Sequence, residues 1–334
     1  DVFDDTTHPI FRQMPSFLAI MSIPAAERDN ILLHSALGHE MGHILAAHFH
    51  DVNGYVTHAA VALDEGQLRT IAKTIAVAAN PAGGATPDWG LFENEVYNSI
   101  KAQSLKVLGS WLSELLADAY AVFLLGPSSL LSLHDLAGPQ VASDTHPPTT
   151  LRYPLMLECL RLSGFRNVGN PTLAWLDERL LAIESSHPVP PIVPNQIHGV
   201  VEACLSSHLD GIAQYVMHPA AHGATAAIPY SFTEWEKTLR TSPMGSSSLL
   251  VERLLNYVIP DCYKPTGQEE EQVADLASIL LSGWAVYYGN WDMFCAGLGK
   301  QTLSEQYVAR QKLFNLLLKA IESSYLQVQW RKYA

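Results

Sequence analysis

His39-Glu40-Met41-Gly42-His43 lies inside an apolar run, residues 31–49, that has the composition of a helix. Residues four apart lie one above the other on a helix, about 6 Å along its axis. The two histidines can therefore hold one Zn²⁺ from the same face. Glu40 lies about 100° round the helix from His39, where it can reach a water on the metal and act as its base. The alternative is a helix whose histidines are ordinary surface or core residues.

A catalytic zinc needs a third protein ligand and an open position for water. The metzincin pattern requires glycine and histidine three and six residues after the second histidine, and Ala46 and Phe49 occupy those places here. The other common solution is a glutamate from a later helix, with an aspartate one turn on. Glu114 and Asp118 have this spacing on an otherwise apolar segment.

Two carboxylates on a buried helix face are costly unless each has a partner. Zinc would be the partner of Glu114, and the N–H of a zinc-bound histidine would be the partner of Asp118. The alternative is an acidic pair that points to solvent, although the neighbouring residues leave little polar face. The spacing therefore favours one split site built from two helices.

Three short blocks together resemble a known group of enzymes. H-E-x-x-H at 39–43, E-L-L-A-D-A-Y-A at 114–121 and H-P-P-T-T-L-R at 146–152 follow one another in this order. They resemble the gluzincin zinc metallopeptidases, and within these the soluble members of the CAAX-prenyl-protease and HtpX-type family. The resemblance covers about residues 25–165, and the C-terminal part of the chain matches no pattern of that family.

The resemblance implies a division of labour among the candidate residues. One Zn²⁺ would be bound by His39, His43 and Glu114, with Glu40 as general base. Asp118 would support a zinc-bound histidine, and Arg152 would anchor the 146–152 loop on a carboxylate near the zinc. His146 would approach the site and stabilise the oxyanion or cap the metal, and Tyr153 is a weaker candidate for the oxyanion donor.

Composition restricts the class of protein and its partners. The chain has 334 residues, 48% of them apolar, which is enough for one large domain or two ordinary ones with a real core. The net charge of −13 argues against nucleic acid as the main partner and is compatible with polypeptide substrates. The most apolar stretch, 105–125, contains Lys106, Glu114 and Asp118, which favours a buried helix over a membrane span.

The four cysteines are far apart and form neither a disulfide framework nor a thiolate zinc site. No signal peptide is visible, so we expect a cytoplasmic location.

The fold is expected to be mainly α, α+β at most. Residues 1–186 would form a zincin-like peptidase domain with a small N-terminal strand at 16–23. A proline-rich linker, 187–195, would lead to an all-helical region, 196–334, that provides a surface for a protein partner or oligomer. Helices are expected at 64–79, 93–106, 110–125, 128–136, 151–162, 173–186, 196–215, 233–240, 247–258, 269–288 and 303–328, with Gly109 as a break.

Together these features predict a soluble zinc metalloendopeptidase that hydrolyses peptide bonds by a zinc-activated water with Glu40 as base. Three alternatives remain open at this stage. The chain could be a zinc hydrolase of a non-peptide bond, an inactive zincin-like binding module, or a peptidase that is latent until triggered.

Overall fold

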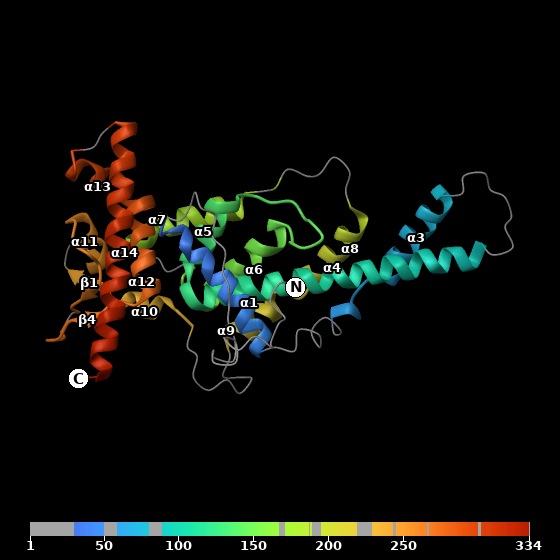
Figure 1. Ribbon diagram of the computed structural model, residues 1–334, viewed down its shortest axis with the longest axis horizontal. Helices are drawn as coiled ribbons and strands as arrows, with labels where there is room; N and C mark the ends of the chain where they lie inside the picture. The colour runs from blue at the N-terminus through green and yellow to red at the C-terminus, as the bar shows by residue number, and fades with distance from the viewer. Residues whose placement is uncertain are drawn as a thin grey trace, which may run out of the picture.

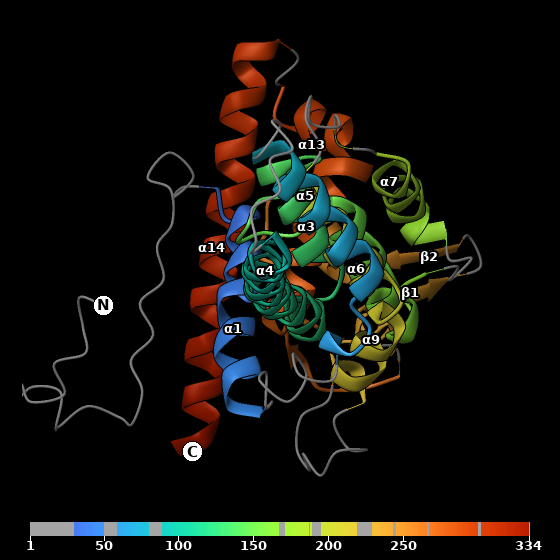
Figure 2. The same cartoon turned by 90° about the vertical axis from the view of Figure 1, so that its right-hand side faces the viewer.

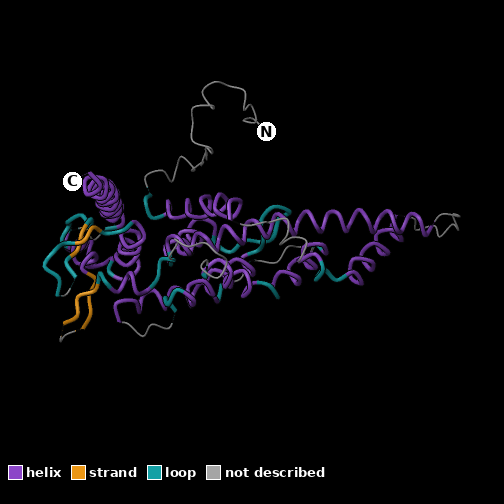
Figure 3. The backbone as a smooth tube through the Cα atoms, turned by 90° about the horizontal axis from the view of Figure 1, so that it is seen from below, coloured by secondary structure: helices purple, strands orange, loops and turns teal. Residues whose placement is uncertain are grey.

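The structure is a computed structural model, and it describes residues 30–49, 59–79, 89–166, 171–186, 188, 195–218, 229–242, 245–265, 267–299 and 302–333. The strand predicted at 16–23 and most of the linker predicted at 187–195 lie outside these residues. Most of the described chain is helical, as Figure 3 shows. The prediction of a mainly α protein is therefore confirmed, whereas a zincin-like core stays a prediction.

The helices of the first half follow the chain in a simple order. A 3₁₀ turn, η3, leads directly into the first long helix, and a second 3₁₀ turn, η4, precedes α7. The bounds are η3 Leu33–Ala36, α1 Leu37–Phe49, α3 Glu65–Ala79, α4 Trp89–Leu125, α5 Pro127–Ala137, α6 Thr149–Leu162, η4 Pro171–Leu173 and α7 Ala174–Glu184.

The second half contains helices and two short hairpins. The helices are α8 Gln196–Ser206, α9 Leu209–Met217, α10 Phe232–Glu236, α11 Leu249–Leu255, α12 Leu276–Trp284, the π-helix η6 Ala285–Gly289, α13 Trp291–Gly297 and α14 Leu303–Tyr333. The strands are β1 Leu239–Ser242, β2 Gly245–Ser248, β3 Cys262–Tyr263 and β4 Gln272–Val273.

The prediction of an all-helical C-terminal region is wrong at these hairpins. β1 pairs antiparallel with β2, and β3 pairs antiparallel with β4. The helix predicted from residue 269 instead begins at Leu276, because Asp275 caps it by accepting a hydrogen bond from the backbone N–H of Ser278 at 2.8 Å. The helix predicted at 196–215 is divided into α8 and α9 by a turn at 207–208.

Helix α4 runs along the longest axis of the molecule, with α3 beside its far end (Figure 1). It is one continuous helix of 37 residues, so the break predicted at Gly109 is wrong. A single glycine costs a helix about 1 kcal/mol relative to alanine. Burial of the neighbouring Leu108, Trp111 and Leu112, each at most 1% exposed, offsets that cost.

Helix α1 packs across α4 at a point where both backbones come close together. A Cβ atom added to Gly42 would lie 2.8 Å from Cα of Ala117 on α4, which is closer than real Cβ atoms approach. The middle of the H-E-x-x-H stretch therefore lies directly on α4. This close approach brings both histidines of α1 to the part of α4 that contains Glu114.

Other helices pack against α4 and against one another. α6 lies against α4, and α8 and α9 pack on α4 and α6. At the end of the molecule opposite to α3, α14 stands crosswise to α4 and contacts α12 (Figures 1 and 2). The division into domains at 1–186 and 196–334 stays a prediction, and α8 and α9 make their contacts across the predicted boundary.

The stretch Gly90–Leu125 of α4 is long and apolar enough to cross a membrane by length and composition alone. In its most apolar window, 72% of the residues are buried inside the protein. A core helix passes the same test, so the absence of a membrane span stays a prediction.

Candidate metal centre

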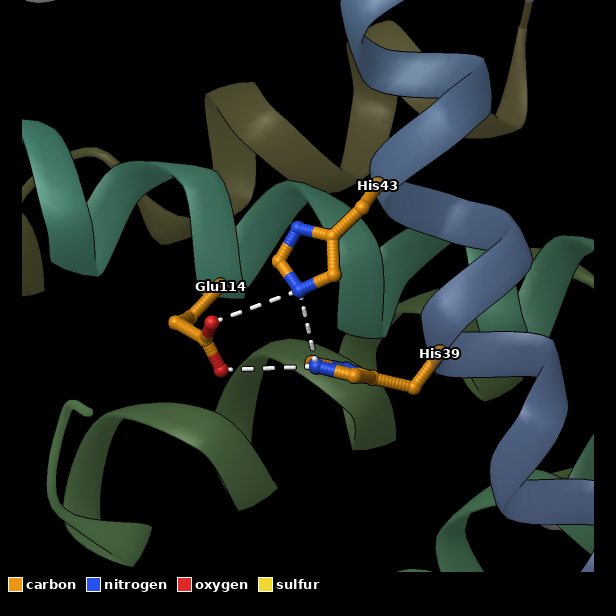
Figure 4. Close-up of side chains that lie close together, drawn as sticks. All are labelled: His39, His43 and Glu114. Atoms are coloured by element: carbon orange, nitrogen blue, oxygen red, sulfur yellow. Dashed lines mark hydrogen bonds and ion pairs between the residues drawn. The ribbon is translucent and has the colours of Figure 1, made fainter. Parts of the chain in front are cut away.

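His39 and His43 of α1 meet Glu114 of α4 at one point, as Figure 4 shows. The Nε2 atoms of the two histidines are 3.1 Å apart. Nε2 of His39 lies 3.3 Å from Oε2 of Glu114, and Nε2 of His43 lies 3.3 Å from Oε1. Two imidazole nitrogens and one carboxylate thus converge with separations of 3.1–3.3 Å between their nearest atoms.

The geometry of this cluster fits a zinc ion. Tetrahedral Zn²⁺ with bonds of about 2.0–2.1 Å requires about 3.3 Å between neighbouring ligand atoms. Oε2 of Glu114 is buried and has no hydrogen-bond partner, although Nε2 of His39 is close to it. A buried carboxylate oxygen without a donor is costly, and a cation between the three side chains would remove that cost. His39, His43 and Glu114 can therefore hold a metal ion.

A buried ion pair fixes the orientation of His39. Oδ1 of Asp118, which is fully buried, lies 2.8 Å from Nδ1 of His39. A carboxylate only accepts hydrogen bonds, so Nδ1 of His39 donates and Nε2 is turned toward the metal cluster. Arg152 of α6 donates to both oxygens of Asp118, at 2.7 and 2.8 Å. This series of hydrogen bonds from His39 through Asp118 to Arg152 thus links α1, α4 and α6.

The charges of these groups shift their proton affinities. Burial alone would lower the pKa of His39, but the negative charge and hydrogen bond of Asp118 outweigh it and raise that pKa to about 9. Burial opposes ionisation of Glu114, yet the close approach and positive charge of His39 and His43 hold its pKa well below the usual range. Burial also opposes ionisation of Asp118, but the charge and hydrogen bonds of Arg152 outweigh it and lower the pKa of Asp118. Both carboxylates are therefore ionised and suited to a cation.

The cluster opens into a cavity of about 310 Å³. Glu40, which is exposed, lines this cavity together with His39 and Glu114. The lining of the cavity includes both polar and apolar residues. The apolar ones are Ala36, Ala121, Leu133, Leu136, Ala137 and Met156.

His146 reaches the cavity from the loop between α5 and α6. Its Nε2 lies 3.9 Å from Oε2 of Glu114, and 57% of its side chain is exposed. Tyr153 is placed differently: its hydroxyl donates to the carbonyl of Gly138 at 3.0 Å, and the side chain does not line the cavity. The geometry thus favours His146 over Tyr153 as a donor at the cavity.

The structure brings all the predicted site residues into one neighbourhood, and it adds two that sequence reasoning did not find. Oγ of Ser113 lies 3.4 Å from Nδ1 of His43, whereas Glu114 contacts Nε2 of the same ring. Gly42 permits the close approach of α1 to α4. Ser113 carried no signal beyond its place beside Glu114, whereas Gly42 stands inside the H-E-x-x-H stretch and was open to interpretation as a contact glycine.

Comparison of the chain with known protein families, curated proteins and solved structures finds no match. The resemblance to gluzincin peptidases therefore rests on the three short motifs, and it stays a prediction.

Proposed function

We propose that this protein is a zinc-dependent endopeptidase of the gluzincin type. The observation that carries the proposal is the convergence of His39, His43 and Glu114 at the edge of a cavity that Glu40 also lines. Two histidines and one glutamate are the protein ligands of known catalytic zinc sites. A bound zinc ion supplies Lewis acidity, which polarises a carbonyl group and makes water a nucleophile near neutral pH.

The protein side chains supply the proton transfers and the orientation. Glu40 takes the proton from the attacking water and delivers it to the leaving amine. His146 donates a hydrogen bond to the oxygen on which negative charge develops, and it is exposed on the cavity wall as such a role requires. Asp118 keeps the proton of His39 on Nδ1, so that Nε2 remains a ligand atom.

The cavity supports a polypeptide substrate. Its apolar lining residues, among them Leu133, Leu136 and Met156, suit it to accept an apolar side chain. The net charge of −13 agrees with a substrate that is not itself acidic. The proposal includes a cytoplasmic location and a protein partner or second copy bound by the C-terminal helices.

Glu40→Gln is the test of this function. The substitution removes the base but keeps the shape of the side chain, so we expect peptide cleavage to fall by about 10²–10⁴-fold while bound zinc and the unfolding midpoint stay unchanged. Cleavage of a quenched fluorescent peptide library, zinc content by mass spectrometry and urea unfolding are the measurements.

Glu95→Gln is the matched control. Glu95 is also exposed, and it lies on α4 about 28 Å along the helix from Glu114. Wild-type cleavage in Glu40→Gln would overturn the proposal. So would zinc-loaded wild-type protein that hydrolyses esters or other non-peptide bonds and no peptide, or that binds peptides without any turnover.

A further inference from the structure

The loop that carries His146 is closed by its own hydrogen bonds. We call residues 138–148, between α5 and α6, the His146 loop. At its tip, the backbone N–H of Ser143 donates to the carbonyl of His146, and the N–H of His146 donates to Oγ of Ser143, both at 3.0 Å. At its base, the N–H of Thr149 donates to the carbonyl of Gln140 at 3.1 Å. The tip is therefore a compact turn that moves as one piece with His146.

Helix α4 holds one side of this tip. The indole N–H of Trp111, a fully buried side chain, donates to the carbonyl of Ser143 at 2.8 Å. The side-chain amide of Gln103 donates to Oδ2 of Asp144 at 3.1 Å. Trp111 lies about one turn and Gln103 about three turns of α4 before Glu114, on the helix that also supplies Glu114 to the metal cluster.

Helix α8 holds the other side. Nε2 of His198 lies 2.8 Å from Oδ1 of Asp144, and its side chain is only 13% exposed. The imidazole also lies against the Trp111 ring, with centroids 5.3 Å apart. One helical turn further on, Glu202 accepts a hydrogen bond from Thr150 at the start of α6. α8 thus contacts the loop at its tip and the helix that follows it.

These contacts form a short path from α8 to the cavity. Asp144 receives a donor from each side, Gln103 and His198, and stands two residues before His146. A hydrogen bond to a carboxylate is stronger than one between two neutral groups. A movement of Asp144 would displace the turn and, with it, the Nε2 atom that faces Glu114.

We infer that His198 is a positioning residue for the reaction proposed above: through Asp144 it holds the His146 loop so that His146 points into the metal cavity. This gives the first helix of the predicted C-terminal region a role in catalysis. The kinetic part of the inference rests on the proposed peptidase function, whereas the structural part does not.

The structural part is tested by hydrogen–deuterium exchange of the metal-free protein. In His198→Ala we expect the amides of Ser143 and His146 to exchange about tenfold faster than in the wild type, because one hydrogen bond to a charged group is lost. The amides of α1 and α4 serve as the internal reference and should not change. His198→Gln, which keeps a side-chain N–H, should restore slow exchange.

Ser206→Ala is the matched control on α8. Its hydroxyl donates only within the helix, to the carbonyl of Glu202 at 2.8 Å. This variant should exchange like the wild type. Equal exchange of the loop in His198→Ala and wild type would overturn the inference, and so would faster exchange spread over α1 and α4.

The kinetic part is tested by a double-mutant cycle with the zinc-loaded enzyme. We expect kcat to fall about 100-fold in His146→Ala and about tenfold in His198→Ala, with KM nearly unchanged. In the double variant, loss of His198 should cost nothing further, because its effect passes through His146. Additive losses would overturn the inference. If the wild type cleaves no peptide, the proposed function fails, and the exchange measurement alone still decides whether His198 holds the loop.

Discussion

The crossing of α1 with α4 and the His146 loop both face the same cavity, but different forces hold them. At the crossing, Asp118 and Arg152 are almost fully buried, and Gly42 lies in backbone contact with α4. In the loop, His146 and Asp144 are more than half exposed, and hydrogen bonds rather than packing fix their positions. The crossing is therefore part of the core, whereas the loop is attached to it.

This difference separates two kinds of functional residue. Residues that bind the metal must be rigid before the ion arrives, since each misplaced ligand weakens binding. A residue that assists the reaction can sit on an exposed segment if a few polar contacts fix its direction. Substitutions at the crossing should thus change stability and metal affinity, whereas substitutions around the loop should change turnover with little effect on stability.

The largest effect is expected at Arg152. Arg152→Leu removes the charge and both hydrogen bonds of the guanidinium from the buried carboxylate of Asp118 and leaves His39 as its remaining partner, so the free energy of unfolding should fall by about 3–5 kcal/mol. Urea unfolding of the metal-free protein measures this. The double variant Asp118→Leu/Arg152→Leu should recover much of the stability, yet bind zinc about 10–100-fold more weakly because His39 loses its support.

Arg161→Leu is the control for this comparison. Arg161 also makes a two-point contact with a carboxylate, that of Glu158, but more than half of its side chain is exposed. Its loss should cost no more than about 1 kcal/mol. Equal destabilisation by Arg152→Leu and Arg161→Leu would show that the buried ion pair contributes no more to the free energy of unfolding than the exposed one.

The next effect is expected at Gly42. In Gly42→Ala the new methyl group meets backbone atoms of Ala117, which no side-chain rotation can relieve, so the helices must separate. We expect a loss of about 1–3 kcal/mol from overpacking and weaker zinc binding, as α1 moves away from Glu114. Thermal unfolding and zinc titration against a chelating dye are the measurements.

Gly211→Ala on α9 provides the contrast, because nothing lies within 4 Å of the added Cβ. There alanine should stabilise the helix by up to about 1 kcal/mol. If both glycine variants behave alike, close contact between α1 and α4 does not determine the site.

The smallest effect is expected at Gln103. Gln103→Ala removes one of the two donors to Asp144 and leaves His198 in place. The free energy of unfolding should change by no more than about 0.5 kcal/mol, and the exchange rate of the loop amides should rise only a few-fold. A loss of stability as large as that of Gly42→Ala would contradict the division between crossing and loop.

The metal cluster could be predicted because its residues stand at fixed spacings on helices. His39 and His43 share a face at i, i+4, as do Glu114 and Asp118, and burial of the two carboxylates required partners. The role of Ser113 was not predictable, since it depends on how α1 lies on α4. The position of His146 followed only from a motif, because the contacts of its loop come from residues of α4 and α8 that are 32 or more positions away in the sequence.

The fold was predictable where apolar periodicity is strong and failed where a local signal competed with burial. Gly109 suggested a break, yet buried Trp111 and Leu112 keep α4 continuous. The two hairpins of the second half were missed, because two- and four-residue strands leave no clear alternation. The tertiary contacts of α8 with the His146 loop had no sequence signal at all.

The continuity of α4 has a mechanical consequence. Gln103 and Trp111, which hold the loop, and Glu114, which belongs to the cluster, are all attached to one unbroken helix. If α4 translates or tilts as a rigid rod, Glu114 and the two side chains with which α4 holds the loop move together, and the distances among these three residues are preserved. A bend of α4 between residues 103 and 114 would change these distances.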